Sequence, residues 1–175
     1  LGMQLTEEQQ AALSRSFDLL AENALQQPVV CVHRDYHSRN LMVSEYHNPG
    51  ILDYQDEVLG AVNYDLVSLL RDCYIRWPRE RVEDWALGYH ELALQTGIIR
   101  PDEADERTFL RWFDWMGVQR HLKAAGIFAR LNHRDGKSGY LDDIPRTLGY
   151  VEEVCARYPE LDELGALTQR VISRL

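Results

Sequence analysis

The sequence predicts a mainly α-helical protein with a small β-hairpin insert, an α+β fold class. Apolar residues recur at helical spacing on both sides of one short segment, residues 29–56. Inside that segment, short apolar runs alternate with polar loops, which is typical of hairpin strands. With 175 residues, 45% of them apolar, the chain is long enough to bury one core. We therefore expect a single domain over residues 1–175, with a leading helix at 6–27, hairpins at 29–56 and a helical region at 63–175.

The leading helix is predicted by its first turn and by its apolar face. Thr6-Glu7-Glu8-Gln9 resembles a capping box, in which two side chains satisfy free backbone amides at a helix start. The residues expected on the buried face are Leu13, Phe17, Leu20 and Ala24.

Three strands are expected in the hairpin segment. Val29–Val32 follows Pro28 and is β-branched, which favours a buried strand. Residues 41–43 repeat the apolar pattern, and the turn-forming residues 47–50 separate them from Ile51 and Leu52. This arrangement delivers two polar stretches, residues 33–40 and 53–56, to one edge of the hairpins.

The region from residue 63 onward reads as a series of helices. One helix is expected to bury Leu66, Leu69, Leu70 and Cys73 and to end at Trp77-Pro78. Pro78 suits the first turn of the next helix, whose expected buried face is Val82, Trp85, Ala86, Tyr89 and Ala93 and whose stop is Gly97. Further helices are expected at about 101–131, 145–158 and 161–175, with a polar loop at 132–139.

Composition excludes several classes of partner. The net charge of -9 and the pI near 5.1 argue against a nucleic-acid partner, which would require a basic face. No apolar run approaches the roughly 20 residues of a membrane span, so we expect no membrane partner. Three widely spaced cysteines in apolar surroundings are typical of reduced core cysteines in a cytoplasmic protein.

The polar stretches carry a pattern suited to phosphoryl transfer. His33-Arg34-Asp35 is followed by Asn40 and then by Asp53 at the end of a strand, which is the spacing of kinase catalytic and metal-binding loops. Asp35 would orient an acceptor hydroxyl and take its proton. Asn40 and Asp53 would supply the hard oxygen ligands that Mg²⁺ prefers.

Five neighbouring residues are candidates for supporting roles. His37 lies between the expected base and the metal ligand, and Arg39 could offset charge on the transferring phosphoryl group or be a solvated or Asp-paired arginine. His33 and Asp65 are expected to support the catalytic loop structurally. Asp56 could make a further contact, to metal, to substrate or within the protein.

Acceptor binding is assigned to a polar cluster in the fourth helical region, formed by Gln119, Arg120, His121 and Lys123. A cationic side chain there would suit a sugar that carries a carboxylate. The alternative is a solvated helix face. Trp112 and Trp115 could stack on a sugar ring, although this spacing is more often that of core residues. Residues 134–137 could form a lid or an ordinary surface turn.

These motifs resemble those of the aminoglycoside phosphotransferase and choline kinase-like family. Within it, three stretches are similar to the bacterial cell-wall amino-sugar kinases, which phosphorylate the anomeric hydroxyl of N-acetylmuramate and N-acetylglucosamine: HRDYHSRNLMV, ILDYQDEVLGAVNYDLVSLLRD and MGVQRHLKAAGIFARLNHRDGKSGYLDDIPRTL. The resemblance implies a protein-kinase-like fold, ATP and Mg²⁺ as cofactors, and a small-molecule acceptor. It also implies that Asp65 braces the catalytic loop.

Kinase-like folds place a Gly-rich loop and a lysine before the catalytic loop to hold the nucleotide. The residues before His33 contain neither. We therefore expect the chain to be the C-terminal lobe of such a fold, with its N-terminal nucleotide lobe absent, and to be inactive alone.

Three other functions stay open at this point. The acceptor could be an aminoglycoside or a choline-like alcohol. His33, Asp35 and His37 could instead ligate a transition metal in a hydrolase, since alternate residues of an extended segment share one face. The chain could also be a non-catalytic kinase-like binding remnant.

Overall fold

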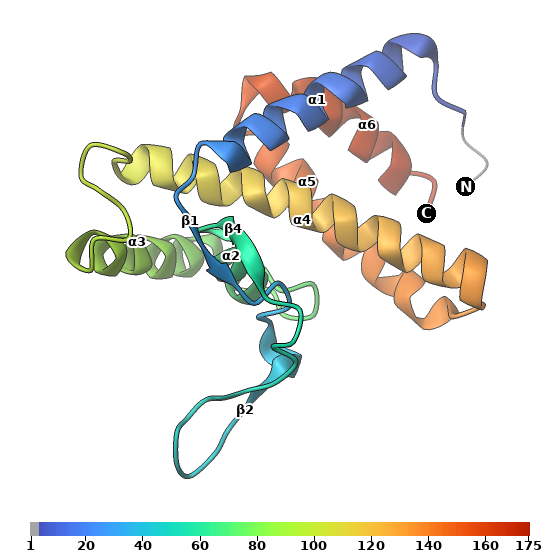
Figure 1. Ribbon diagram of the computed structural model, residues 1–175. Helices are drawn as coiled ribbons and strands as arrows, with labels where there is room; N and C mark the ends of the chain where they lie inside the picture. Colours follow the sequence, from blue (N-terminus) through green and yellow to red (C-terminus); the bar gives the residue numbers. More distant parts are fainter. Residues whose placement is uncertain (1–3) are drawn as a thin grey trace. The chain divides into compact units, whose positions relative to one another are not determined.

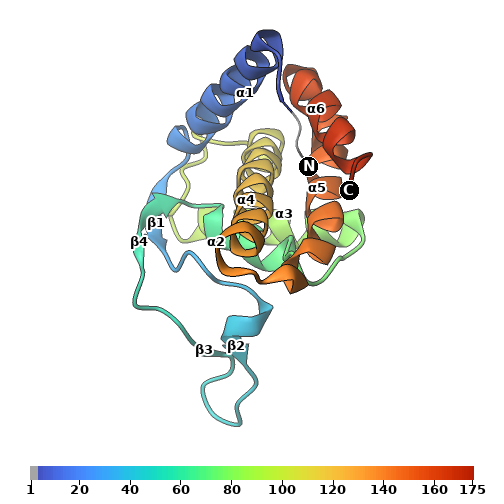
Figure 2. The same ribbon diagram turned by 90° about the vertical axis from the view of Figure 1, so that its right-hand side faces the viewer.

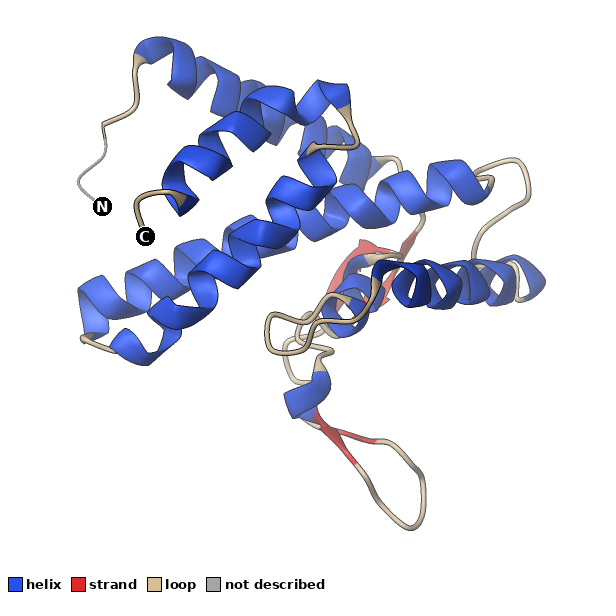
Figure 3. Cartoon of the chain, turned by 180° about the vertical axis from the view of Figure 1, so that it is seen from behind, coloured by secondary structure: helices blue, strands red, loops and turns tan. Residues whose placement is uncertain are grey.

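The computed structural model describes residues 4–175, so the first three residues of the expected single domain lie outside the described part. The chain forms two compact units. One contains the chain up to Asn23 together with Gly117–Leu175, and the other is Ala24–Met116. Helices α1 (Glu7–Leu25) and α4 (Glu106–Asp135) each contribute to both units. Figure 1 shows the order of the elements along the chain, and Figure 3 shows that helices make up most of it.

The capping box at the start of α1 is confirmed. The Thr6 amide donates to Gln9 Oε1 at 3.0 Å, and the Gln9 amide donates to Thr6 Oγ1 at 3.2 Å. The predicted buried face is wrong in part, because Phe17 is 49% exposed. The residues that α1 buries are Ala12, Ser16, Leu20 and Asn23. The buried face of α1 is therefore offset by about one residue from the face that carries the largest apolar side chains. It includes small and polar side chains.

The first unit also contains α5 (Ile144–Cys155) and α6 (Asp162–Ile172), which pack against each other, with short 3₁₀ turns η2 (Ser138–Asp143) and η3 (Pro159–Leu161) before them. Arg15 of α1 forms an ion pair with Glu163 of α6, in which Nη2 donates to both carboxylate oxygens at 2.8 and 2.9 Å. Helix α4 continues to Asp135, so residues 132–135 are helical and the predicted polar loop is shorter than expected. No helix within residues 4–175 has the length and apolar character needed to cross a membrane.

The second unit contains two small antiparallel sheets (Figure 2). Strand β1 (Val29–Val32) pairs with β4 (Val58–Ala61), and β2 (Leu41–Met42) pairs with β3 (Gly50–Ile51). The sequence did not predict β4. It also predicted β1 as buried, whereas Val29 is 67% exposed and only Val32 is buried. Gly60 of β4 is opposite Val30, and a Cβ atom there would lie 2.9 Å from a methyl of Val32, so this close approach requires glycine.

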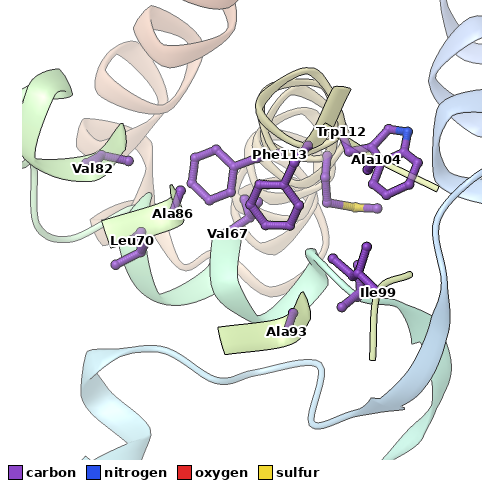
Figure 4. Packing of buried hydrophobic residues seen from close by; sticks show 12 residues of the cluster. Val67, Leu70, Val82, Ala86, Ala93, Ile99, Ala104, Trp112 and Phe113 are labelled. Atoms are coloured by element: carbon purple, nitrogen blue, oxygen red, sulfur yellow. The ribbon is translucent and has the colours of Figure 1, made fainter. Parts of the chain in front are cut away.

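The core of the second unit is built by α2 (Tyr64–Leu70), α3 (Arg79–Gln95) and the first part of α4. Val67, Ala86 and Phe113 point toward one another within this cluster (Figure 4). Gly97, with φ of 74°, follows the end of α3 as predicted. Two expectations are wrong: α2 ends at Leu70 instead of continuing to Trp77-Pro78, and Trp85 is 42% exposed instead of buried.

The three cysteines are not joined in disulfides, and they do not share one environment. Cys155 is buried, as predicted for a core cysteine, and Cys73 is half-buried. Cys31 is exposed, which corrects the prediction, and its Sγ–H donates to Glu57 Oε2 at 3.8 Å. Burial and then the negative charge of Asp162 raise the pKa of the Cys155 thiol to about 12.

A thiol-labelling experiment checks this difference. A thiol reacts as its thiolate, so Cys155 should stay unlabelled by a disulfide reagent at pH 8 until urea unfolds the chain, whereas the exposed Cys31 should react in the native protein. Because the folded pKa of Cys155 lies above its ordinary value of 9.0, the stability that this thiol contributes is complete below pH 9 and is lost between pH 9 and about 12. Native-state labelling of Cys155 at pH 8 as fast as that of Cys31 would contradict the assignment. Mass spectrometry of tryptic peptides identifies the labelled site.

Candidate active site

The loop between β1 and β2 is closed on the backbone carbonyl of Asp35. That oxygen accepts hydrogen bonds from the His37 amide and from Asn40 Nδ2, both at 2.9 Å. Arg34, with φ of 77°, turns the chain away from the direction of β1. In this conformation the Asp35 side chain is exposed, while its backbone carbonyl holds the loop together.

Asn40 connects this loop to the segment after β3 that carries Asp53. It ends the 3₁₀ turn η1 (Ser38–Asn40), and its backbone carbonyl accepts from the Leu52 amide at 2.9 Å. Because Asn40 uses its Nδ2 within the loop, its Oδ1 is the atom that remains for a cation. Asp53 follows Leu52 directly and adopts a left-handed φ of 64°, with one carboxylate oxygen, Oδ1, accepting from Gln55 Nε2 at 2.5 Å. An amide oxygen and a carboxylate are ligands that fit Mg²⁺.

The carboxylate of Asp65 binds the start of the loop. Asp65 Oδ2 accepts from the His33 amide at 2.6 Å, and Oδ1 accepts from the Arg34 amide at 3.0 Å. The His33 side chain is buried, and its Nε2 lies 2.8 Å from the carbonyl oxygen of Leu52. These contacts are those that a supporting role for His33 and Asp65 requires.

Sequence reasoning missed a second carboxylate, Asp72, which binds the other end of the loop. Asp72 Oδ2 accepts from the Ser38 amide at 3.1 Å and from its hydroxyl at 2.5 Å. Asp72 is only 3% exposed. The available signal was an acidic residue two positions after the last apolar residue of α2, since a buried carboxylate needs hydrogen-bond donors.

The remaining loop residues gather around Tyr74. The Arg39 guanidinium lies 3.4 Å from the centre of the Tyr74 ring, and the His37 ring meets it edge-on at 6.1 Å. Arg39 is exposed, in agreement with the solvated alternative, and its stacking on the Tyr74 ring was not predicted from the sequence. The His37 Nδ1 is buried and has no hydrogen-bond partner among residues 4–175. Asp56 is exposed, and its backbone carbonyl accepts from Arg34 Nη1 at 3.4 Å.

A buried ion network lies next to Asp72. Asp114 of α4, with a side chain only 2% exposed, pairs with Arg71 and also with Arg79 at 3.1 Å. Arg79 reaches Glu83 at 2.5 Å as well. Arg71, the residue before Asp72, is thereby linked through Asp114 of α4 to Arg79 of α3.

The residues proposed for acceptor binding belong to the other unit. Gln119 and Lys123 line a pocket of about 300 Å³ together with Phe17, Leu20, Ala21 and Leu122. His121 is 1% exposed and stacks on Tyr150 at 4.7 Å, which is the packing of a core residue. Arg120 is half-buried, and both Trp112 and Trp115 are buried, as the core interpretation predicts.

The hydrolase alternative lacks its ligand set. Among residues 4–175, no three or more His, Cys, Asp and Glu side chains converge as a group that could hold a metal ion. His33 Nε2 is instead engaged by the Leu52 carbonyl.

A match to a family model assigns the chain to a known protein family. The model of the phosphotransferase enzyme family matches residues 3–107, a range that includes the loop, Asp53, Asp65 and Asp72. The chain belongs to the phosphotransferase enzyme family. The resemblance seen in the sequence is thereby confirmed, and Asp35, Asn40 and Asp53 all lie inside the phosphotransferase match.

The chain is also similar to three curated bacterial phosphotransferases, each named N-acetylmuramate/N-acetylglucosamine kinase. The protein of Pseudomonas putida is 52% identical over 95% of this chain and 48% of its own length. That of Neisseria meningitidis is 49% identical over 98% of this chain and 51% of its own length. That of Pseudomonas aeruginosa is 51% identical over 95% of this chain and 48% of its own length. The chain thus spans about half the length of these relatives.

Proposed function

We propose that this phosphotransferase moves the γ-phosphoryl group of ATP to the anomeric hydroxyl of an amino sugar, N-acetylmuramate or N-acetylglucosamine. The observation that supports the reaction type is the pair of hydrogen bonds that join Asn40 to the carbonyl of Asp35 and to the amide of Leu52, the residue before Asp53. The names and identities of the relatives support the amino sugar as acceptor.

In this proposal Asp35 is the base. Its exposed carboxylate takes the proton of the sugar hydroxyl as that oxygen bonds to the γ-phosphorus and the bond to the β-phosphate oxygen breaks, which releases ADP. Mg²⁺, held by Asn40 Oδ1 and the Asp53 carboxylate, would supply neutralising charge to the phosphate oxygens.

His37 and Arg39 complete the proposed site. The Arg39 guanidinium, held on the Tyr74 ring, offsets negative charge on the phosphoryl group, and His37 supports it by packing edge-on against the same ring. Gln119, Arg120 and Lys123 remain the proposed acceptor-binding residues, and an arginine or lysine suits the carboxylate of N-acetylmuramate. His121 would act there through packing against Tyr150.

A transfer assay with defined acceptors tests the proposal. The 175-residue chain, and separately the protein encoded by the complete reading frame that contains it, are incubated with Mg-ATP. The acceptor is N-acetylmuramate, N-acetylglucosamine, choline or kanamycin. We expect an amino-sugar 1-phosphate, seen by ³¹P NMR and by the loss of the reducing end. The methyl glycoside of N-acetylglucosamine is the matched control, because its anomeric oxygen is blocked and it should accept nothing.

Each of the other outcomes would overturn one specific part of the proposal. Phosphorylation of choline or kanamycin alone would keep the reaction type and discard the acceptor. Phosphorylation of the methyl glycoside would discard the anomeric position. No transfer to any acceptor by either protein would overturn the proposed activity and favour a binding role.

A further inference from the structure

The segment Arg71–Tyr74, here called the post-helix segment, is packed against the turn that contains Asn40. Helix α2 ends at Leu70, and Asp72 then accepts three hydrogen bonds in a buried position: two from Ser38 and one from the Tyr74 amide, at 3.0 Å to Oδ1. Tyr74 in turn holds Arg39 by ring stacking. The post-helix segment therefore contacts two of the three residues of η1.

The position of Ser38 determines the position of Asn40. Ser38 is the first residue of η1 and Asn40 is the last, and the Asn40 amide donates to the carbonyl of His37 at 2.9 Å. A shift of Ser38 would rotate this one-turn element and with it the Asn40 side chain, which has to donate to Asp35 through Nδ2 and present Oδ1 to a cation.

Two carboxylates thus hold the two ends of the loop from the two ends of α2. Asp65, in the first turn of α2, binds the amides of His33 and Arg34, and Asp72, just past its last residue, binds Ser38. The first contact lies beside Asp35 and the second beside Asn40. We propose that Asp72 is a positioning residue that, through Ser38, fixes the orientation in which Asn40 offers its side-chain oxygen to the metal ion. This role rests on the proposed phosphotransferase function.

Four variants separate positioning from simple stabilisation. Asp72→Asn places an NH₂ group against the donors of Ser38 or Tyr74, and Ser38→Ala removes one of the two bonds from Ser38. Ser38→Thr keeps a hydroxyl and serves as the conservative rescue. Asp105→Asn is the matched control, because Asp105 is a carboxylate of the same unit that accepts a backbone amide, that of Thr108 at the start of α4, instead of one in the loop.

Two readouts need no turnover. The first is hydrogen exchange of the Asn40 amide by NMR, and the second is the Kd of Mn²⁺, used in place of Mg²⁺ and measured by electron paramagnetic resonance. We expect Asp72→Asn to speed Asn40 exchange and to raise the Mn²⁺ Kd about tenfold or more, the size typical of lost support for a metal ligand. Ser38→Ala should shift both values in the same direction by less, and Ser38→Thr should stay near wild type. Asp105→Asn should lower stability while leaving both values near wild type.

The outcomes distinguish this inference from the proposed function. If Asp72→Asn lowers stability like Asp105→Asn but changes neither Asn40 exchange nor Mn²⁺ affinity, the positioning role is overturned. If the wild-type chain and complete protein bind no Mn²⁺ even with ATP present, the metal role of Asn40 fails, and the exchange rate still decides whether Asp72 fixes the turn. Should Asp72→Asn not fold, the contrast between Ser38→Ala and Ser38→Thr gives the same decision.

Discussion

Asp35→Asn is expected to reduce the rate of phosphate transfer by about 10²–10⁴-fold, the usual contribution of a general base. An amide cannot take up the hydroxyl proton, so the substituted side chain can orient the acceptor but cannot complete the reaction. The fold should not change, because the loop is closed on the main-chain oxygen of Asp35 and the side chain is exposed. The measurement is kcat in the transfer assay, paired with the thermal unfolding midpoint of each protein.

The matched control for this variant is Glu45→Gln, which neutralises an exposed acid in the connection between β2 and β3. It should retain the wild-type rate. A near-normal kcat for Asp35→Asn would remove Asp35 from the role of base. A lost rate together with a lowered unfolding midpoint would show that Asp35 acts on the fold instead.

Asp114→Ala should give the largest loss of stability, a decrease of about 3–5 kcal/mol in the free energy of unfolding. Asp114 is the shared partner of Arg71 and Arg79, and the Arg71 side chain is only 6% exposed. Removing the carboxylate takes from the buried Arg71 guanidinium the negative charge that Asp114 supplies to it. Urea unfolding of the 175-residue chain, followed by circular dichroism, measures the difference.

Asp102→Ala is the surface counterpart of this variant. Asp102 pairs with Arg100 at 3.5 Å, but its side chain is 81% exposed, so the loss should stay below about 1 kcal/mol. Asp114→Leu combined with Arg71→Met should recover most of the stability lost in Asp114→Ala, since it removes the buried charges together. Equal losses of unfolding free energy for Asp114→Ala and Asp102→Ala would show that the buried network stabilises the fold no more than a surface ion pair does.

Local signals in the sequence predicted the parts of the fold that depend on neighbouring residues. Thr6 and Gln9 predicted the start of α1, and Gly97 predicted the stop after α3, because capping and left-handed turns are decided within a few residues. The alternation of apolar runs and polar loops predicted that residues 33–40 and 53–56 would be delivered to one edge of the hairpins, and a hydrogen bond joins Asn40 to Leu52, the residue before Asp53.

Features that depend on distant segments could not be predicted in the same way. Strand β4 exists because it pairs with β1, and its Gly60 reads locally as a turn residue although it is there to make room for Val32. Phe17 and Trp85 match a helical apolar pattern, yet tertiary packing left both exposed. Asp72 was missed because its partner, Ser38, is remote in sequence, and nothing near Asp72 names that partner.

The placement of Asp65 and Asp72 at opposite ends of α2 has a consequence for how the gene can change. Each residue added to an α-helix turns everything after it by about 100° and advances it by about 1.5 Å. A single-codon insertion or deletion within residues 66–71 would leave Asp65 in place but would move Asp72 away from Ser38. Substitutions at these positions that keep the helix and its length would preserve both contacts. The exposed connection at residues 43–49 has no such constraint, and length variation among descendants of this gene should accumulate there and avoid α2.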